Sequence, residues 1–313
     1  MISAVLATML GLGIPTQANG DIEAPGPNGP LRGTMNLPAK DAPIILMIPG
    51  SGPTDRDGNS PLGVRAAPYR LLAEGLAVQG IGSLRIDKRG MFGSQGAVID
   101  ANAVTIDDYV RDIGAWVDLI RTQTGAKCVW LLGHSEGGLV ALTSAAKVEH
   151  LCGLILVATA GRPLGDVLKE QLHANPANAP LMRAANQAID ELSAGRAVDV
   201  ANFPPELARL FSPSVQEFLI STFPLDPAVL VGKIAKPILI MQGERDLQVS
   251  VADAERLARA APSATLVILP DTNHVLKQVG SGGRNPNLAT YGADDLPLAP
   301  GVVDSIARFV RSS

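Results

Sequence analysis

A serine between two glycines stands where a strand-like segment gives way to a helix-like one. Gly133, Ser135 and Gly137 form a Gly-x-Ser-x-Gly motif, with the apolar run 129–132 before it and the helix-forming run 139–147 after it. A strand–turn–helix of this kind holds the serine in a strained backbone conformation and exposes its hydroxyl as a nucleophile. The two glycines leave space where a Cβ atom would collide with a neighbouring strand or helix. The helix then directs its N-terminal amides at the reacting centre, where they favour negative charge.

A serine hydroxyl needs a base to accept its proton, and the chain has only four histidines. His134 lies inside the motif and should point away from Ser135. His150 ends the helix that follows the motif, and His173 lies in a region broken by prolines. His274 follows the last predicted strand, in a loop at the carboxyl end of the sheet, where sites gather in open α/β proteins. We therefore predict that His274 is the base, with a purely structural histidine as the alternative.

The acid that orients the imidazole should come from another loop at the carboxyl end of a strand, between the serine and the histidine in chain order. Asp246 follows the predicted strand 237–241 and is the candidate, with Glu244 as the alternative. Asp271 lies too near His274 in sequence to orient its ring. The acid holds the imidazole tautomer and stabilises the imidazolium without accepting the proton itself.

Negative charge that develops on a carbonyl oxygen needs preorganised N–H donors. The amide of Glu136, directly after the serine, should be one of them. The second should come from the glycine-containing loop after the predicted strand 44–48. The amide of Ser51 is favoured, with those of Gly50 and Gly52 as alternatives. The opposing interpretation is that these glycines are ordinary turn residues.

Predicted strands and helices alternate along most of the chain, which indicates a mostly parallel sheet with helices on both faces. Strands are expected at 44–48, 81–86, 129–132, 153–158, 237–241 and 264–269, and helices at 69–78, 106–120, 139–147, 251–261 and 301–311. The clearest helix has Thr105 as its N-cap, because apolar residues recur every three or four positions from Ile106 to Ile120. Between 161 and 231 prolines separate short helical stretches, which predicts an inserted helical cap rather than an independent domain.

Residues 1–18 are predicted to be a signal peptide, which leaves 19–313 as the catalytic domain. The apolar stretch is too short to span a bilayer, and Thr16 and Ala18 supply the small residues of a signal-peptidase site. The positively charged start that is usual for such peptides is missing, so a packed strand or helix is the alternative. Residues 19–32 are rich in glycine and proline and are expected to be an exposed start. Export is predicted, with a cytoplasmic location as the alternative.

The spacing of the two cysteines leaves two states open. Cys128 begins the strand before Ser135, and Cys152 precedes the next strand, so both lie near one sheet edge if those strands are parallel neighbours. An oxidising compartment would then permit a disulfide that closes a loop of roughly 24 residues. Two buried, unpaired thiols that behave as small hydrophobic side chains are the slightly favoured alternative.

The charge and composition of the chain disfavour several other functions. The net charge is −4, and no basic cluster is longer than Lys88-Arg89, which argues against a nucleic-acid interface. Aromatic residues make up only 4% of the chain, so a base-stacking surface is not expected either. We predict a small-molecule substrate, no nucleic-acid partner and no stable membrane span, and the sequence leaves the oligomeric state open.

One loop resembles the start of a calcium site, in the pattern Asp55-x-Asp57-x-Asn59. A calcium loop needs glycine at its sixth position and a closing glutamate, and this chain has neither. We therefore predict no metal and an ion pair through Arg56 that braces the loop. The segment 87–89 is predicted to be a similar brace.

Together these residues resemble the α/β-hydrolase superfamily, and within it bacterial serine hydrolases. The resemblance covers about 31–310 and rests on GSGPTDRDG at 50–58, DKRG at 87–90, GHSEG at 133–137 and NHVLK at 273–277. It implies a triad of Ser135, Asp246 and His274, and carboxylic ester hydrolysis without a metal or organic cofactor. One departure is Pro49, which stands where a histidine often precedes the first loop glycine.

The predicted reaction is acyl transfer from a carboxylic ester to water through an acyl-enzyme on Ser135. Peptidase or amidase, thioesterase and lactonase activities use the same triad and remain alternatives. A haloalkane dehalogenase or epoxide hydrolase is disfavoured, because those relatives need an aspartate where Ser135 stands. A non-catalytic binding protein on the same fold is the alternative from another class. The apolar, proline-broken cap favours small to medium esters over charged substrates.

Overall fold

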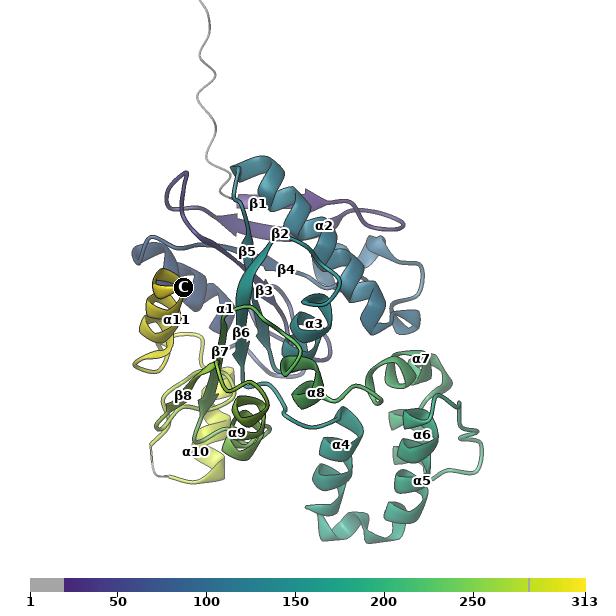
Figure 1. The fold of residues 1–313 in the computed structure, drawn as a ribbon. Helices are drawn as coiled ribbons and strands as arrows, with labels where there is room; N and C mark the ends of the chain where they lie inside the picture. Colours follow the sequence, from purple (N-terminus) through teal and green to yellow (C-terminus); the bar gives the residue numbers. More distant parts are fainter. Residues whose placement is uncertain (1–19, 281) are drawn as a thin grey trace, which may run out of the picture.

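The computed structural model describes residues 20–280 and 282–313, so the predicted signal peptide lies outside the described residues. An eight-stranded sheet runs through the protein in the order β1-β2-β4-β3-β5-β6-β7-β8 (Figure 1). The strands are β1 (Gly20–Ala24), β2 (Leu31–Asn36), β3 (Ile44–Ile48), β4 (Gly82–Ile86), β5 (Val129–His134), β6 (Leu151–Val157), β7 (Ile238–Gly243) and β8 (Thr265–Leu269). Strands β3 to β8 are parallel, whereas β2 runs antiparallel to both β1 and β4. The predicted α/β class with a mostly parallel sheet is confirmed.

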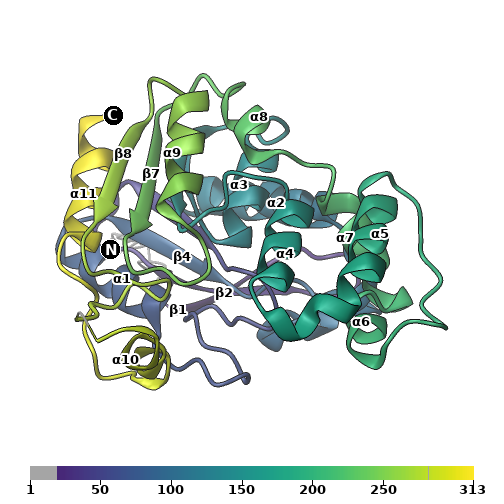
Figure 2. The same cartoon turned by 90° about the horizontal axis from the view of Figure 1, so that it is seen from below.

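Helices cover both faces of this sheet (Figures 1 and 2). One face carries α1 (Pro68–Val78) and α11 (Val302–Ser312), and the other carries α2 (Ile106–Thr124), α3 (Glu136–Ser144) and α9 (Val251–Ala260). Successive side chains of a strand point to opposite faces, so Ile45 of β3 packs with the α1 side and Leu46 with the α2 side. All residues of β3, β5 and β7 are therefore buried, which explains their mostly apolar sequences.

Helix α2 forms where its pattern predicts it. The Thr105 hydroxyl accepts the amide of Asp108, and the Asp108 carboxylate accepts the amide of Thr105, which makes a capping box. The helix ends at Gly125, whose φ of 76° is a left-handed conformation that glycine adopts at low cost. Its inward face buries Ile113 and Trp116 against the sheet.

Residues 20–32 are mostly exposed, as predicted, but they include strand β1 and the start of β2, which were not predicted. Strand β1 pairs with β2, and β2 buries Leu31 and Met35 on alternate positions. The two strands are short and separated by glycines and prolines, so their alternation is too brief to stand out in the sequence. A short helix, α10 (Arg284–Ala289), is also present and was not predicted.

A helical lobe lies between β6 and β7 and stands beside the sheet (Figures 1 and 2). It consists of α4 (Leu164–His173), α5 (Met182–Ser193), α6 (Pro205–Leu210) and α7 (Pro213–Thr222), and α8 (Pro227–Val231) returns the chain to β7. The lobe has its own small core, which includes Ile189, Phe211 and Phe223. These helices fall within 161–231, the range predicted to be a cap.

The two cysteines form a disulfide, so the favoured interpretation of unpaired thiols is wrong. Cys128 and Cys152 are bonded, with their Cα atoms 5.1 Å apart. The reason lies in the register, because β5 and β6 are parallel neighbours and Val129 pairs with Leu151. The bond lies at the amino end of these strands, whereas the Gly-x-Ser-x-Gly motif follows their carboxyl end.

Candidate active site

Ser135 occupies a tight turn between β5 and α3. Its φ of 55° and ψ of −121° are strained for a residue with a side chain, as the motif predicts. A Cβ atom on Gly133 would lie 2.2 Å from the carbonyl oxygen of Gly137, and one on Gly137 would lie 2.3 Å from that of Ile48. Only glycine fits at either position, so the predicted reason for both glycines is confirmed.

Asp246 and His274 meet although they lie on different loops. Asp246 follows β7, His274 follows β8, and Asp246 Oδ2 is 2.8 Å from His274 Nδ1. Both side chains are buried. The Asp246 carboxylate also accepts the amides of Gln248 at 2.7 Å and Val249 at 3.0 Å. Burial alone would raise the pKa of Asp246, but His274 and these donors outweigh it and hold the pKa below its ordinary value.

The other acids considered for this place do not contact His274. Glu244 is exposed, and Asp271 pairs with Arg245 at 3.4 Å on the surface. Asp246 is therefore the carboxylate that the fold brings to the imidazole.

Ser135 and His274 line one cavity of about 230 Å³. Gly50, Ser51 and Tyr69 belong to its wall, as do side chains that follow β7 and α10. Among the residues described, the Ser135 hydroxyl has no hydrogen-bond partner, His274 included. Hydrogen bonds between a nucleophile and its base are often long until substrate is bound.

The loop after β3 brings backbone amides to the serine. A Cβ atom on Gly50 would lie 3.3 Å from the Cβ atom of Ser135, so this backbone approaches the nucleophile closely. The Gly50 amide donates to the Tyr69 hydroxyl at 3.2 Å and is therefore committed elsewhere. Within the described chain, the amides of Ser51, Gly52 and Glu136 have no acceptor. They remain the candidates for holding an oxyanion.

Tyr69 and His134 form a hydrogen-bonded link between the two loops that flank Ser135. His134 Nε2 lies 2.8 Å from the carbonyl oxygen of His274, which can only accept, so this nitrogen carries the proton. His134 Nδ1 must then accept from the Tyr69 hydroxyl, 2.9 Å away, while the Tyr69 oxygen accepts from the Gly50 amide. Burial and the nearby His274 lower the pKa of His134 to about 3, so the ring is neutral. Sequence alone gives these two residues no role, because they lie 65 positions apart.

The predicted braces are present. Arg56 binds Asp87 with its Nε atom at 2.9 Å and its Nη2 atom at 2.7 Å. Arg89, in the same DKRG segment, pairs with Asp112 of α2 at 2.6 Å. Asp55 accepts the amides of Asp57 at 2.9 Å and of Asn59 at 2.8 Å, so its carboxylate shapes the turn.

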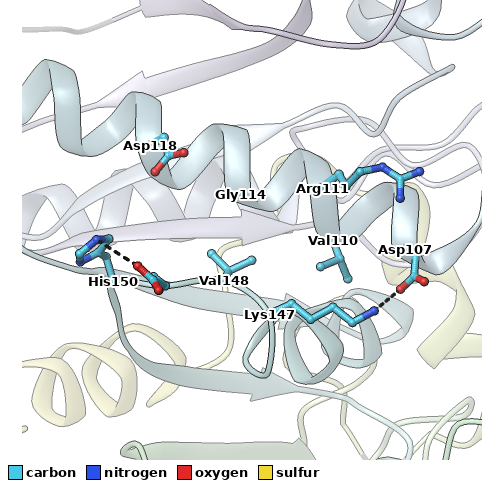
Figure 3. Close-up of a pocket in the computed structure, with 9 residues that line it drawn as sticks. Asp107, Val110, Arg111, Gly114, Asp118, Lys147, Val148 and His150 are labelled. Atoms are coloured by element: carbon cyan, nitrogen blue, oxygen red, sulfur yellow. Dashed lines mark hydrogen bonds and ion pairs between the residues drawn. The ribbon is translucent and has the colours of Figure 1, made fainter.

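A larger cavity, of about 440 Å³, lies away from these residues (Figure 3). It runs between α2 and the segment that connects α3 to β6. Several of its charged side chains are paired, as in the 2.6 Å contact between Lys147 and Asp107. His150, in its wall, lies just before β6, at the edge of the sheet opposite to Ser135. The smaller cavity therefore holds the candidate chemistry.

Comparisons with solved structures agree with this architecture. Est1E from Butyrivibrio proteoclasticus superposes with a TM-score of 0.59 at 17% identity, over 94% of this chain and 98% of that chain. A thermophilic esterase from Thermogutta terrifontis gives a TM-score of 0.57 at 19% identity, over 93% and 98%. The chain has the α/β-hydrolase fold.

The sequence is similar to one family model and to one named relative. Residues 62–204 match the model of the serine aminopeptidase S33 family. Esterase EstD of Thermotoga maritima is 24% identical over 287 residues, which cover 90% of this chain. The matched region spans 65% of the length of that relative. The described residues contain no helix long and apolar enough to cross a membrane.

Proposed function

We propose that this protein is a serine esterase that hydrolyses carboxylic esters through an acyl-enzyme on Ser135. The observation that carries the proposal is the 2.8 Å hydrogen bond between Asp246 and His274, whose imidazole lines the same cavity as the strained serine. EstD and the two solved structures described above are named or described as esterases or carry an esterase name, which supports ester over amide bonds. The aminopeptidase family model supports peptide hydrolysis as the second candidate.

The mechanism follows from the polarity of each group. Ser135 Oγ attacks the ester carbonyl and gives its proton to His274 Nε2, while Asp246 accepts a hydrogen bond from His274 Nδ1–H and stabilises the imidazolium. The amides of Ser51 and Glu136 donate hydrogen bonds to the tetrahedral oxyanion. Each such donor lowers the activation barrier by about 3–4 kcal/mol. His274 returns the proton to the departing alkoxide. Water, deprotonated by His274, then attacks the acyl-enzyme, releases the acid and restores Ser135.

Two cavities beside the loop after β3 suggest the size of the substrate. The first, about 230 Å³, contains Ser135 and Tyr69. The second, about 190 Å³, lies between Glu136 and Tyr109 on one side and Phe218 of the helical lobe on the other. Both are too small for a polymer and fit the acyl and alcohol parts of a small to medium ester.

We also propose that the protein is exported. The predicted signal peptide, residues 1–18, supports this location. The bond between Cys128 and Cys152 supports it independently, because structural disulfides persist in oxidising compartments.

Ser135→Ala tests the proposed function. A fluorophosphonate probe should label the wild-type protein at Ser135, and kcat/KM for 4-nitrophenyl butyrate should fall at least about 10⁴-fold in the variant. Ser144→Ala is the matched control, because Ser144 is a buried serine on α3 that should keep both labelling and hydrolysis. Labelling that persists in Ser135→Ala would contradict the proposal. An aminoacyl 4-nitroanilide, assayed in parallel, distinguishes the peptidase alternative.

A further inference from the structure

Lys88 is a buried cation that contacts both segments that carry the proposed oxyanion donors. It follows β4, and its side chain is only 3% exposed. Its ammonium donates to the carbonyl oxygen of Gly50 at 2.7 Å and to Glu136 Oε1 at 3.1 Å. Burial alone would lower the pKa of Lys88, but the Glu136 carboxylate outweighs it and raises the pKa above its ordinary value. Removing a charged ammonium from water costs free energy even when it has partners, so the burial of Lys88 calls for a functional explanation.

The contact with Gly50 bears on the direction of the Ser51 amide. The carbonyl of Gly50 and the N–H of Ser51 belong to one peptide unit, which is planar and trans, so the two bonds point in opposite directions. Lys88 holds the carbonyl on its own side, and the N–H must therefore point the other way. Glycine restricts the backbone torsion angles less than any other residue, so the orientation of the Gly50–Ser51 peptide depends on contacts from outside the loop. On the preceding side, Tyr69 fixes the Gly50 amide.

The second contact links Lys88 to the other proposed donor. Glu136 supplies its own amide to the oxyanion site, and its side chain accepts from the same ammonium. One cation therefore fastens the loop after β3 to the first turn of α3. Pro49 stands where a histidine often precedes the first loop glycine, and it has neither a side-chain donor nor an N–H group to anchor this loop. The contact from Lys88 to the Gly50 carbonyl supplies an anchor at the next residue.

We propose that Lys88 is a positioning residue that orients the Gly50–Ser51 peptide so that the Ser51 amide faces the oxyanion. The inference rests on the proposed esterase function. A residue that acts on a transition-state donor affects kcat, whereas KM and ground-state binding change little. A lysine that only stabilised the fold would lower the free energy of unfolding without this distinction.

Lys88→Met tests the proposal because methionine keeps much of the apolar stem and removes the ammonium. We expect kcat for 4-nitrophenyl butyrate to fall about 10²- to 10³-fold, the usual effect of losing one oxyanion donor, with KM within threefold. Affinity for butaneboronic acid, which forms a tetrahedral adduct on the serine, should fall in parallel. Affinity for the non-hydrolysed amide analogue of the substrate should stay unchanged. Titration of the reactive serine with the fluorophosphonate gives the concentration of folded, active protein, and each kcat is calculated from that concentration.

Arg89→Met is the matched control, since Arg89 is the adjacent buried cation and pairs with Asp108 and Asp112 rather than with Gly50. It should lower the melting temperature but keep kcat within threefold. If Lys88→Met does not fold, Lys88→Gln replaces it, because the shorter side chain does not reach the Gly50 carbonyl. A kcat within threefold of wild type in a folded Lys88 variant, or an equal loss in Arg89→Met, overturns the inference. A wild-type protein that neither labels nor hydrolyses esters contradicts the proposed function instead.

Discussion

His134 connects the two loops beside Ser135 as a neutral imidazole. Its Nε2–H group donates to the backbone of His274, and its Nδ1 atom accepts from Tyr69. Protonation would place a second hydrogen on Nδ1, where the Tyr69 hydroxyl already donates. Burial, followed by the nearby His274, lowers the pKa of His134 to about 3, which keeps the ring in the neutral form that these two hydrogen bonds require.

His134 should therefore make folding stability sensitive to mild acid. An unfolded histidine binds a proton as the pH falls below about 6.5, whereas folded His134 does not until about pH 3. Between these two pH values the unfolded state binds more protons than the folded state. The free energy of unfolding therefore decreases as the pH decreases, by up to about 1.4 kcal/mol per pH unit. Urea unfolding at pH 7, 6 and 5 should show a steeper loss in wild type than in His134→Gln. His173→Gln, at an exposed position, should keep the wild-type slope, and an equal slope in His134→Gln would refute this origin.

At the residue scale, sequence identifies the proposed catalytic groups better than the residues that hold them in place. Ser135 follows from its glycines, and His274 and Asp246 follow from chain order and from loops at strand ends. Tyr69 escapes notice because nothing in a helix pattern distinguishes a buried tyrosine whose hydroxyl bonds a distant histidine. Such links depend on three-dimensional packing and leave no local spacing to read.

The elements show where periodicity is sufficient. Helix α2 is predicted correctly at its start because its cap and its apolar repeat agree. Strands β1 and β2 are missed because they are only five and six residues long, and β1 buries only Ala24. The disulfide is left open by sequence because the redox state depends on the compartment, although the strand order makes it geometrically possible.

Cys128→Ala combined with Cys152→Ala should destabilise the protein without altering catalysis. The bond closes a loop between residues 24 positions apart, and the chain-entropy model assigns about 3 kcal/mol to a loop of this length. We expect a lower urea midpoint in the double variant and in dithiothreitol-treated wild type. Ester hydrolysis should stay within twofold in native buffer, since the bond lies at the opposite edge of the sheet. Unchanged stability in the double variant would show that the cross-link is not formed in solution.

The whole molecule combines a rigid sheet with a helical lobe that has a core of its own. The second cavity lies between these two parts, with Tyr109 on the α2 side and Val215 and Phe218 on the lobe side. We therefore propose that lobe residues limit substrate length, whereas the proposed reacting groups all belong to the sheet and its loops. Sequence predicts the proline-broken helices at 161–231, but the shape of the space beneath them depends on packing between distant side chains.

Val215→Phe should narrow this second cavity and shorten the preferred ester. The larger ring fills space that longer chains need, and a poorly accommodated methylene costs about 1–3 kcal/mol. We expect kcat/KM for 4-nitrophenyl octanoate to fall at least tenfold while that for the acetate stays within threefold. Val229→Phe, on exposed α8, is the control and should leave the ratio unchanged. Equal losses on both esters would assign the second cavity no part in chain-length selection.

Arg56 connects strand β1 to the loop that carries Ser51. Its guanidinium binds Asp87 on one side and Asp21 of β1, at 3.1 Å, on the other. The first strand is thus coupled, through a single side chain, to the loop that carries Ser51. A recombinant version that begins beyond Asp21, or a bulky affinity tag fused directly to Gly20, would remove or displace that partner. The exposed end at Ser313 is the safer place for such a fusion.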